Sequence, residues 1–438
     1  MTTEQDSKDL PDIEVGEDHV LAHNVDEEPV EANRRLFEGG LLKFVALLAI
    51  AYSAFHLYSL NIAPLETWSF RIVHIAGALV LGFVLFAGAR FVSSEEGGAR
   101  HRWTTWIIAG AMLPALYVLY QTFSFWQMVQ NGAMRIPVEL EVWHFGWPLL
   151  AATGVGIVMS WFHQRERSVF SVPDLVLIVC SLAVAAYFLV VYNTSMRMST
   201  GTSFAPLGIS FAAIAGTALI MELTRRVAGM ALVIIGLVFL AYVFAGPYLP
   251  GFLGYPGLSV QRFFSQVYTD AGILGPTTAV SSTYIILFII FAAFLQSSKV
   301  GDYFVNFAFA AAGRSRGGPA KVSIFASGLM GMINGTSAGN VVSTGSLTIP
   351  LMKKVGYSKQ SAGAVEAAAS TGGQIMPPIM GAGAFIMAEI TGIPYTEIAI
   401  AAIIPAILYF ASVYFMVDFE AAKTGMRGMR EDELPKLR

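Results

Sequence analysis

Two short polar stretches interrupt apolar sequence in the second half of the chain. The first, residues 334–340, reads NGTSAGN and lies between the apolar segments 321–333 and 341–352. The second, residues 372–378, reads GGQIMPP. Hydroxyl, amide and carbonyl oxygens are the ligands that a hard cation prefers. Gly and Pro disfavour helix and so free backbone carbonyls. The two stretches therefore predict a site lined by oxygen atoms, suited to an ion such as Na⁺.

The composition is that of an integral membrane protein. Of 438 residues, 55% are hydrophobic and only 13% are charged, whereas an ordinary soluble domain has about 25% charged residues. With a net charge of −3, the chain has no excess of basic residues of the kind that nucleic-acid binding requires. We therefore expect membrane lipid, and no nucleic acid, among the partners of the chain.

The sequence shows no pattern of an enzyme. The only cysteine, Cys180, lies in an apolar segment, so a disulfide within the chain is excluded and a packing role is expected. The seven histidines are scattered without the spacing of metal ligands. A phosphate-binding loop and a nucleophile elbow are both absent from the sequence. We therefore expect no enzymatic activity.

The apolar segments predict a polytopic helical protein. Crossing a bilayer takes about 20 apolar residues, and Lys and Arg concentrate in cytoplasmic loops. The basic residues of the predicted inner loops, among them Arg35 and Arg226, indicate a cytoplasmic N-terminus. The chain would begin with an acidic, disordered tail at 1–38. The sequence GDYFVNFAFAAAGRSRGG (301–318) is predicted to lie along the cytoplasmic interface. The predicted spans are 41–60, 72–91, 103–120, 145–163, 174–192, 205–222, 228–249, 277–295 and 397–417.

The first polar stretch predicts a re-entrant hairpin over 319–352. Each flanking segment would form roughly 20 Å of helix, which is too short to cross the membrane. Irregular backbone at membrane depth is tolerated only where protein or water surrounds it. Close helix packing is an alternative reason for small residues. It explains the Gly and Ala residues of the tip but not Asn334, Thr336, Ser337 and Asn340.

The second stretch predicts a transmembrane helix, 360–390, that is broken at GGQIMPP. A simple proline kink is the alternative, but the doubled Gly beside Gln374 favours a break. Paired interruptions of this kind are typical of secondary transporters. The sequence between Ser323 and Thr348 contains no acid, base or histidine, which favours sodium over a proton relay. Glu366 is the nearest acid, and pairing with a cation and a packing or interfacial role both remain open for it.

The sequence from GRSRGGPAKVSIF through NGTSAGNVVSTG to STGGQIMPPIMGAGAFIMAE resembles a known family over about 313–396. It is similar to the large permease component of tripartite ATP-independent periplasmic (TRAP) transporters, and most similar to fused permeases that work with TAXI-type binding proteins. The stretches MELTRRVAG, GPYLPGFLG and PAILYF extend the resemblance to about 220–438. The earlier helices match a fused small permease only in hydropathy and position.

The resemblance implies a bacterial or archaeal inner-membrane permease that imports a small, carboxylated solute with sodium as the coupling ion and no other cofactor. It implies an elevator-type mechanism and a periplasmic substrate-binding protein as partner. The fold class would be all-α, a polytopic bundle with a re-entrant hairpin and a broken helix. Residues 39–227 would form small-permease-like scaffold helices, 228–417 the N-terminal repeat of the large permease, and 418–438 a cytoplasmic linker.

The resemblance also implies a set of site residues at the two interruptions. The tip would face sodium and the solute, and the break would form the opposing wall. The tip reads NGTSAGN where relatives often have a Ser-Gly-Ser core. Sodium is expected near Asn334, Gly335, Ser337 and Gly373. The implied site is Asn334, Gly335, Thr336, Ser337, Ala338, Gly339 and Asn340 at the tip, with Thr371, Gly372, Gly373, Gln374, Pro377 and Pro378 opposite.

The chain departs from the family pattern in one respect. These permeases contain two inverted repeats, each with its own hairpin, and this sequence shows one hairpin. We therefore expect the N-terminal half of the large-permease region, either truncated at Arg438 or completed by a second chain. A non-transporting scaffold subunit is the alternative function, and a channel would also use polar re-entrant loops. The aromatic segment 246–275 is expected either to dock the binding protein or to form an interfacial helix packed on the scaffold.

Overall fold

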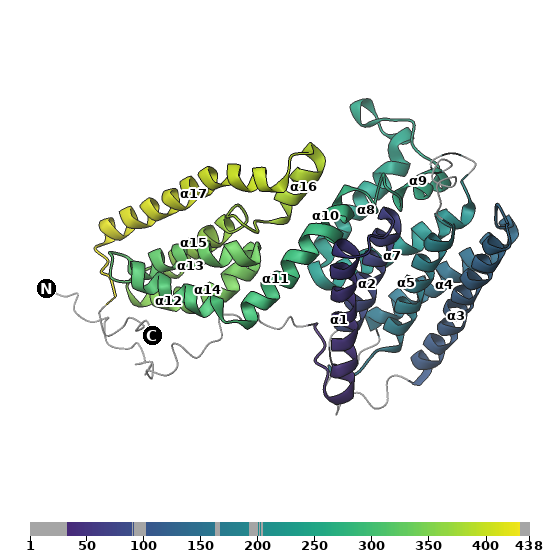
Figure 1. Ribbon diagram of the computed structural model, residues 1–438, viewed down its shortest axis with the longest axis horizontal. Helices are drawn as coiled ribbons and strands as arrows, with labels where there is room; N and C mark the ends of the chain where they lie inside the picture. The colour runs from purple at the N-terminus through teal and green to yellow at the C-terminus, as the bar shows by residue number, and fades with distance from the viewer. Residues whose placement is uncertain are drawn as a thin grey trace. The chain divides into compact units, whose positions relative to one another are not determined.

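The computed structural model describes residues 33–89, 91, 102–162, 167–191, 200, 202 and 205–429, without the side chains of 102–109 and 296. Most of the predicted disordered tail at 1–38, and the end of the predicted linker at 418–438, lie outside the described residues. Two compact units divide at Phe288: an N-terminal unit up to Leu287 and a C-terminal unit from Phe288 onward. The described residues are almost entirely helical (Figure 1), so the predicted all-α class is confirmed.

The N-terminal unit is a bundle built around α5, which packs against α2, α3, α4 and α7. Its core includes the fully buried side chains of Leu177, Cys180, Tyr187 and Phe188, so the packing role predicted for Cys180 is confirmed. Its helices are α1 (Gly39–Asn61), α2 (Thr67–Leu85), α3 (Arg102–Gln130), the π-helix η1 (Leu140–Gly146), α4 (Trp147–Phe162), α5 (Val172–Val191), α7 (Leu207–Ala228) and α8 (Met230–Ala245).

The segment after α8 is short and irregular. It contains the 3₁₀ turns η2 (Gly246–Tyr248) and η3 (Gly251–Leu253), followed by α9 (Val260–Val267). The helix α9 packs on α7 and buries Phe264 in the core of the bundle. A continuous helical run then forms α10 (Pro276–Val280), the π-helix η4 (Ser281–Ile285) and α11 (Ile286–Ser297), which leads into the C-terminal unit.

The C-terminal unit consists of shorter helices and one long one. It contains the end of α11, then α12 (Val300–Ala312), α13 (Gly318–Asn334), α14 (Ser337–Lys354), α15 (Lys359–Gly372), α16 (Ala382–Thr391) and α17 (Tyr395–Thr424). Helix α12 buries Val305, Ala308 and Phe309 in a cluster with residues of α13. Its predicted position at the cytoplasmic interface stays a prediction.

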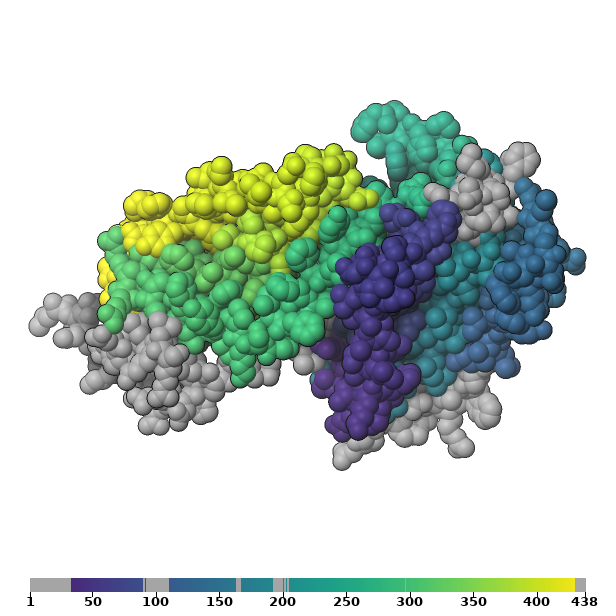
Figure 2. Space-filling model, in the orientation of Figure 1, coloured from purple at the N-terminus to yellow at the C-terminus, as the bar shows by residue number. Residues whose placement is uncertain are grey.

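Eight helical segments of the described chain are long and apolar enough to cross a membrane: Gly39–Asn61, Thr67–Leu85, Leu140–Phe162, Val172–Val191, Leu207–Ala228, Met230–Tyr248, Pro276–Leu295 and Tyr395–Thr424. They coincide with all but one of the predicted spans. The span predicted at 103–120 falls in α3, whose residues 102–109 are described without their side chains, so this span stays a prediction. Figure 2 shows α1 and α17 on the surface of their units, and little of either span is buried.

The two predicted interruptions lie where the helices of the C-terminal unit end. Only Gly335 and Thr336 separate α13 from α14, and residues 373–381 separate α15 from α16. The tip is therefore shorter than the polar sequence suggests, because Ser337 to Asn340 form the first turn of α14. At 17 and 18 residues, the two hairpin helices are about 26 Å long, still less than the ~30 Å of a bilayer core.

Candidate functional site

The hairpin tip touches the break between α15 and α16. Gly335 ends α13 in the left-handed conformation, with φ +59°. A Cβ at Gly335 would clash with the carbonyl oxygen of Met380, and Gly381 lies against the carbonyl oxygen of Gly335. One turn earlier, Gly331 meets the backbone of Gly373. Glycine is thus required at Gly335 both by its backbone conformation and by the close approach of the two interruptions.

Several polar groups of the tip hold its own turn together. Thr336 caps α14, because its Oγ1 accepts a hydrogen bond from the Gly339 N–H at 3.0 Å. The Oδ1 of Asn334 accepts from the Thr336 N–H at 3.3 Å. Across the gap, the Nε2 of Gln374 donates to the Ser337 Oγ at 3.1 Å. These oxygens form a polar surface in which the tip and the break are already joined.

The irregular backbone of the break is fixed by hydrogen bonds within it and from α17. The Gly381 N–H donates to the Gln374 carbonyl at 2.7 Å. The hydroxyl of Tyr395, at the start of α17, lies 2.6 Å from the carbonyl oxygens of both Pro378 and Ile379. Helix α16 therefore starts afresh at Ala382, and its N-terminus lies near the N-terminus of α14 because Gly381 contacts Gly335.

Asn340 carries an oxygen without a partner. The side chain is 0% exposed, and its Nδ2 donates to the Ser327 carbonyl at 2.7 Å. Its Oδ1 is buried and accepts no hydrogen bond from the described residues. A buried polar atom left unpaired costs about 1–3 kcal/mol. The Nδ2 of Asn340 lies against Gly373, so the amide group that carries this acceptor is next to the break.

Other predicted residues lie away from this contact. Thr371 is exposed, and its hydroxyl donates to the Ala367 carbonyl of its own helix at 2.7 Å. Gly372 faces the rings of Tyr409 and Phe410 on α17. Ala338 is exposed at the tip. The structure therefore brings together Gly335, Ser337, Asn340, Gly373 and Gln374, while Thr371 and Gly372 face elsewhere.

A second polar cluster lies deeper in the hairpin, around Glu366 of α15. Its carboxylate is 0% exposed and accepts hydrogen bonds from five hydroxyl groups. Ser323 lies 2.7 Å from Oε2, and Ser327 and Ser370 each lie 3.2 Å from Oε1. The hydroxyls of Thr344 and Thr348 complete the set. We call these six residues the Glu366 cluster.

Sequence reasoning missed the Glu366 cluster. The hairpin sequence itself contains no acid, as predicted, but α15 inserts one between α13 and α14. The signal is present as three pairs spaced four residues apart, one pair on each helix, a spacing that places both members on one helix face. The pairs are Ser323 and Ser327, Thr344 and Thr348, and Glu366 and Ser370.

A sequence model of one protein family matches residues 215–438, and its description is tripartite ATP-independent periplasmic transporter, DctM component. The chain belongs to the DctM family of TRAP transporters. This agrees with the resemblance derived from the two polar stretches. With the apolar helices, it makes the chain a multi-pass protein of the inner membrane.

Curated relatives are similar over parts of their length. The C4-dicarboxylate TRAP transporter large permease protein DctM of Vibrio cholerae is 37% identical over 91 residues, 21% of this chain and 20% of that protein. The protein of the same name from Rhodobacter capsulatus is 30% identical over 151 residues, 34% of each chain. The uncharacterized protein y4mL of Sinorhizobium fredii is 25% identical over 138 residues. The chain thus matches 20 to 34% of the length of these relatives.

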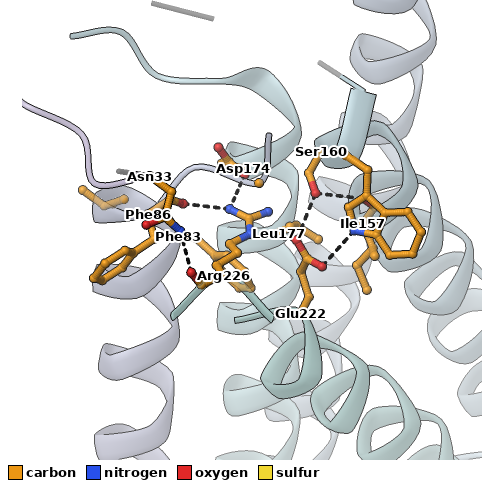
Figure 3. A network of polar contacts seen from close by, with 12 residues as sticks. Asn33, Phe83, Phe86, Ile157, Ser160, Asp174, Leu177, Glu222 and Arg226 are labelled. Carbon is orange, nitrogen blue, oxygen red and sulfur yellow. Dashed lines mark hydrogen bonds and ion pairs between the residues drawn. The ribbon is translucent and has the colours of Figure 1, made fainter. Parts of the chain in front are cut away.

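A buried ion-pair network joins the DctM-matched sequence to the helices before it. Arg226, near the end of α7, contacts Asp174 of α5 at 2.7 Å, and Arg35 contacts the other oxygen of Asp174. Glu222 pairs with Arg226 at 2.7 Å and accepts from Ser160 of α4 at 3.1 Å (Figure 3). Asp174 lies before the match and Glu222 within it.

The arginines of this network also cap α2. Arg35 donates to the carbonyls of Phe83 and Val84 at 2.8 and 2.9 Å. Arg226 donates to the Phe86 carbonyl at 3.0 Å. Cations at a helix C-terminus satisfy its free carbonyls and oppose the negative end of its dipole. Arg35 and Arg226, which support the predicted orientation as loop charges, are therefore structural residues, and the orientation stays a prediction.

Proposed function

We propose that the chain is the permease component of a sodium-coupled TRAP uptake system that takes its solute from a periplasmic binding protein. The ion and solute would bind where the hairpin tip meets the break, and the C-terminal unit that carries them would move in an elevator-type mechanism. Family membership supports the coarse function. The observation that carries the finer one is the buried, unpartnered Oδ1 of Asn340.

Sodium fits the tip because every available ligand is an oxygen. Asn340 offers its amide oxygen. The carbonyl oxygens of Gly372, Gly373 and Gln374 each accept one hydrogen bond within the break, and the second lone pair of such an oxygen can bind a cation. Hard cations are bound by such carbonyl and amide oxygens, and unwound carbonyls coordinate coupling ions in transporters built from broken helices. A bound cation would give the Asn340 oxygen the partner that it lacks.

A carboxylated solute fits the same place. The N-termini of α14 and α16 approach each other across the contact of Gly335 with Gly381. The first turn of neither helix contains an acidic residue. Helix N-termini favour anionic groups. Two of the three relatives bear the name C4-dicarboxylate TRAP transporter large permease protein, and we propose a carboxylate of this class as the solute.

The segment after α8 is the proposed docking surface for the binding protein. Tyr248 and Phe252 in its turns are 88% and 95% exposed. The turns are tied down by Tyr242, whose hydroxyl donates to the Leu253 carbonyl at 3.0 Å. Helix α9 corresponds to the alternative of a helix packed on the bundle, so the two expectations for 246–275 fall on different parts of it. A second chain that completes the permease, and a TAXI-type partner, belong to the same proposal.

The experiment is uptake of labelled succinate by proteoliposomes that contain the chain, the rest of its permease and the binding protein. A sodium gradient should drive accumulation, and Asn340→Ala should reduce it by about tenfold or more because a cation ligand is lost. Asn61→Ala, at an exposed amide that bonds only to its own helix, is the control. Equilibration without accumulation would indicate a channel, and unaffected uptake in Asn340→Ala would remove the tip from the site.

A further inference from the structure

The Glu366 carboxylate is buried without a compensating charge. In the described part of the chain it forms no ion pair, and all of its hydrogen-bond donors are neutral hydroxyls. The buried cation of α13, Lys321, pairs with Asp418 of α17 at 2.6 Å. Of the other titratable groups on the surrounding helices, Lys353, Lys354 and Lys359 are exposed, and Glu366 forms no ion pair with them among the described residues. Helix α12 contributes Asp302 and Tyr303, and α17 contributes Tyr395, Glu397, Tyr409, Tyr414, Glu420 and Lys423.

An isolated charge of this kind is unfavourable in a dry interior. Buried charges are normally paired or bound to metal ions. Five hydroxyl donors replace the water around the carboxylate, but they do not neutralise its charge. With Glu366 ionised, the site has one net negative charge between the hairpin helices, and a single positive charge would balance it.

Each threonine hydroxyl of the cluster has a second hydrogen-bond acceptor besides Glu366. Thr344 has one proton but two acceptors, the Glu366 carboxylate and the Asn340 carbonyl at 2.9 Å. Thr348 likewise faces both Glu366 and the Thr344 carbonyl at 3.0 Å. Turning each proton to the carbonyl leaves the hydroxyl hydrogen-bonded and exposes its lone pairs. The cluster can thus solvate a bare carboxylate or offer oxygens to a cation.

Three of the five hydroxyl oxygens of the cluster gather at one oxygen of the carboxylate. Ser327, Thr344 and Ser370 all contact Oε1. The Ser327 Oγ lies 3.0 Å from the Thr344 Oγ1 and 3.5 Å from the Ser370 Oγ. The set contains oxygen ligands only, which suits a hard cation and not a soft transition metal. One carboxylate matches the charge of a monovalent ion.

We propose that the Glu366 cluster is a second cation site, separate from the tip, that binds one hard monovalent cation on the Glu366 carboxylate. Sodium and a proton share the required chemistry. The tip and the cluster are neighbours, because Asn340 donates to the Ser327 carbonyl and Thr344 can donate to that of Asn340. The inference goes beyond the proposed function and concerns binding to the resting protein.

The test is equilibrium binding of ²²Na⁺ to the purified full chain in detergent, near neutral pH. Glu366→Gln should remove one sodium ion per chain from the bound total. Thr348→Val should lower the affinity for that ion by about 10- to 100-fold, which is the range for residues that contact the ligands of a metal site. Glu389→Gln and Thr424→Val make the same chemical changes at exposed positions and should leave binding unchanged.

A proton as the cation gives a different signature. Sodium binding would then be the same in Glu366→Gln, while the infrared spectrum of the unmodified chain would contain the carbonyl band of a buried protonated carboxylic acid that the variant lacks. If Glu366→Gln changes neither sodium binding nor this band, the proposal is wrong and the cluster only packs the hairpin. If Glu366→Gln does not fold, Thr348→Val decides through sodium affinity and through a shift of the same band.

The tip is tested separately in the same assay. Asn340→Ala should remove the tip ion and leave the Glu366 ion bound. Loss of sodium in Asn340→Ala alone, with no change of the carboxylic-acid band in Glu366→Gln, would support the proposed function and contradict the second site. Loss of a sodium ion in Glu366→Gln but not in Asn340→Ala would support the second site and contradict the tip as a sodium site.

Discussion

At the scale of single residues, the candidate site depends on atoms that have no ordinary role in packing. Among the described residues, the Asn340 amide oxygen accepts no hydrogen bond and the Glu366 carboxyl group has no ion-pair partner. Gly335 contributes through the absence of a side chain, because the Met380 carbonyl occupies the space of a Cβ. Each of these features costs folding free energy, and such costs are concentrated at functional sites.

Gly335→Ala should destabilise the hairpin. Alanine in the left-handed conformation costs about 1–2 kcal/mol, and its Cβ would push Met380 away from the tip. We expect a lower midpoint of thermal unfolding and weaker sodium binding by the purified chain. Gly383→Ala, in α16 where a Cβ meets no atom within 4 Å, is the matched control. An unfolding midpoint for Gly335→Ala equal to that of the control would contradict the close approach of tip and break.

At the scale of elements, each interruption is followed directly by the N-terminus of a new helix. Helix α14 begins directly after the tip, and α16 begins directly after the break. Their N-termini are held by local groups: the Thr336 cap for α14 and, through Tyr395, the loop that precedes α16. Two short helices that start at one place concentrate free N–H groups there, which a pair of continuous helices would not do.

Thr336→Ala should loosen the first turn of α14. Loss of an N-cap costs about 0.5–2 kcal/mol, and the Gly339 amide loses its acceptor. Hydrogen exchange measured by mass spectrometry should show faster exchange in the peptide that contains this amide, while Thr336→Ser should restore protection because it keeps the capping oxygen. Equal exchange in Thr336→Ala and the unmodified chain would mean that the cap does not hold the tip.

At the scale of the whole molecule, the chain consists of two compact units with different internal organisation. The N-terminal unit has a continuous apolar core and a buried ion-pair network at one end of its helices. The C-terminal unit has smaller apolar clusters and places its polar groups among its helices. The family match begins at residue 215, inside α7, so it starts within the N-terminal unit.

Asp174→Asn should destabilise the N-terminal unit. The change removes the negative charge that faces both Arg35 and Arg226, and breaking a buried pair costs about 3–5 kcal/mol. We expect faster proteolysis of the bundle, with sodium binding per folded chain unchanged because the tip and the Glu366 cluster lie in the other unit. Glu38→Gln, at an exposed acid, is the control. A bundle as resistant as the unmodified one would mean that the network contributes little to stability.

The sequence by itself determined the features that depend on local preferences. Composition established the membrane class, and Gly and Pro marked where the helices end near Gly335 and after Gly372, because backbone dihedrals and missing N–H donors act on the residues that carry them. The oxygen-rich tip also follows from the sequence, although Thr336 caps a helix and so makes the irregular part shorter than the polar stretch.

Only the tertiary structure decided which polar groups meet. Glu366 lies 18 residues from Thr348 and 43 from Ser323 along the chain, and the spacing within each helix gives no sign of its partners on the other two. The sequence predicts Arg35 and Arg226 to be loop charges, whereas in the structure both are buried against Asp174. Burial and hydrogen bonding arise between helix faces, so a charge that sequence places beside the membrane can lie inside a bundle, and an acid from one helix can complete the polar core of two others.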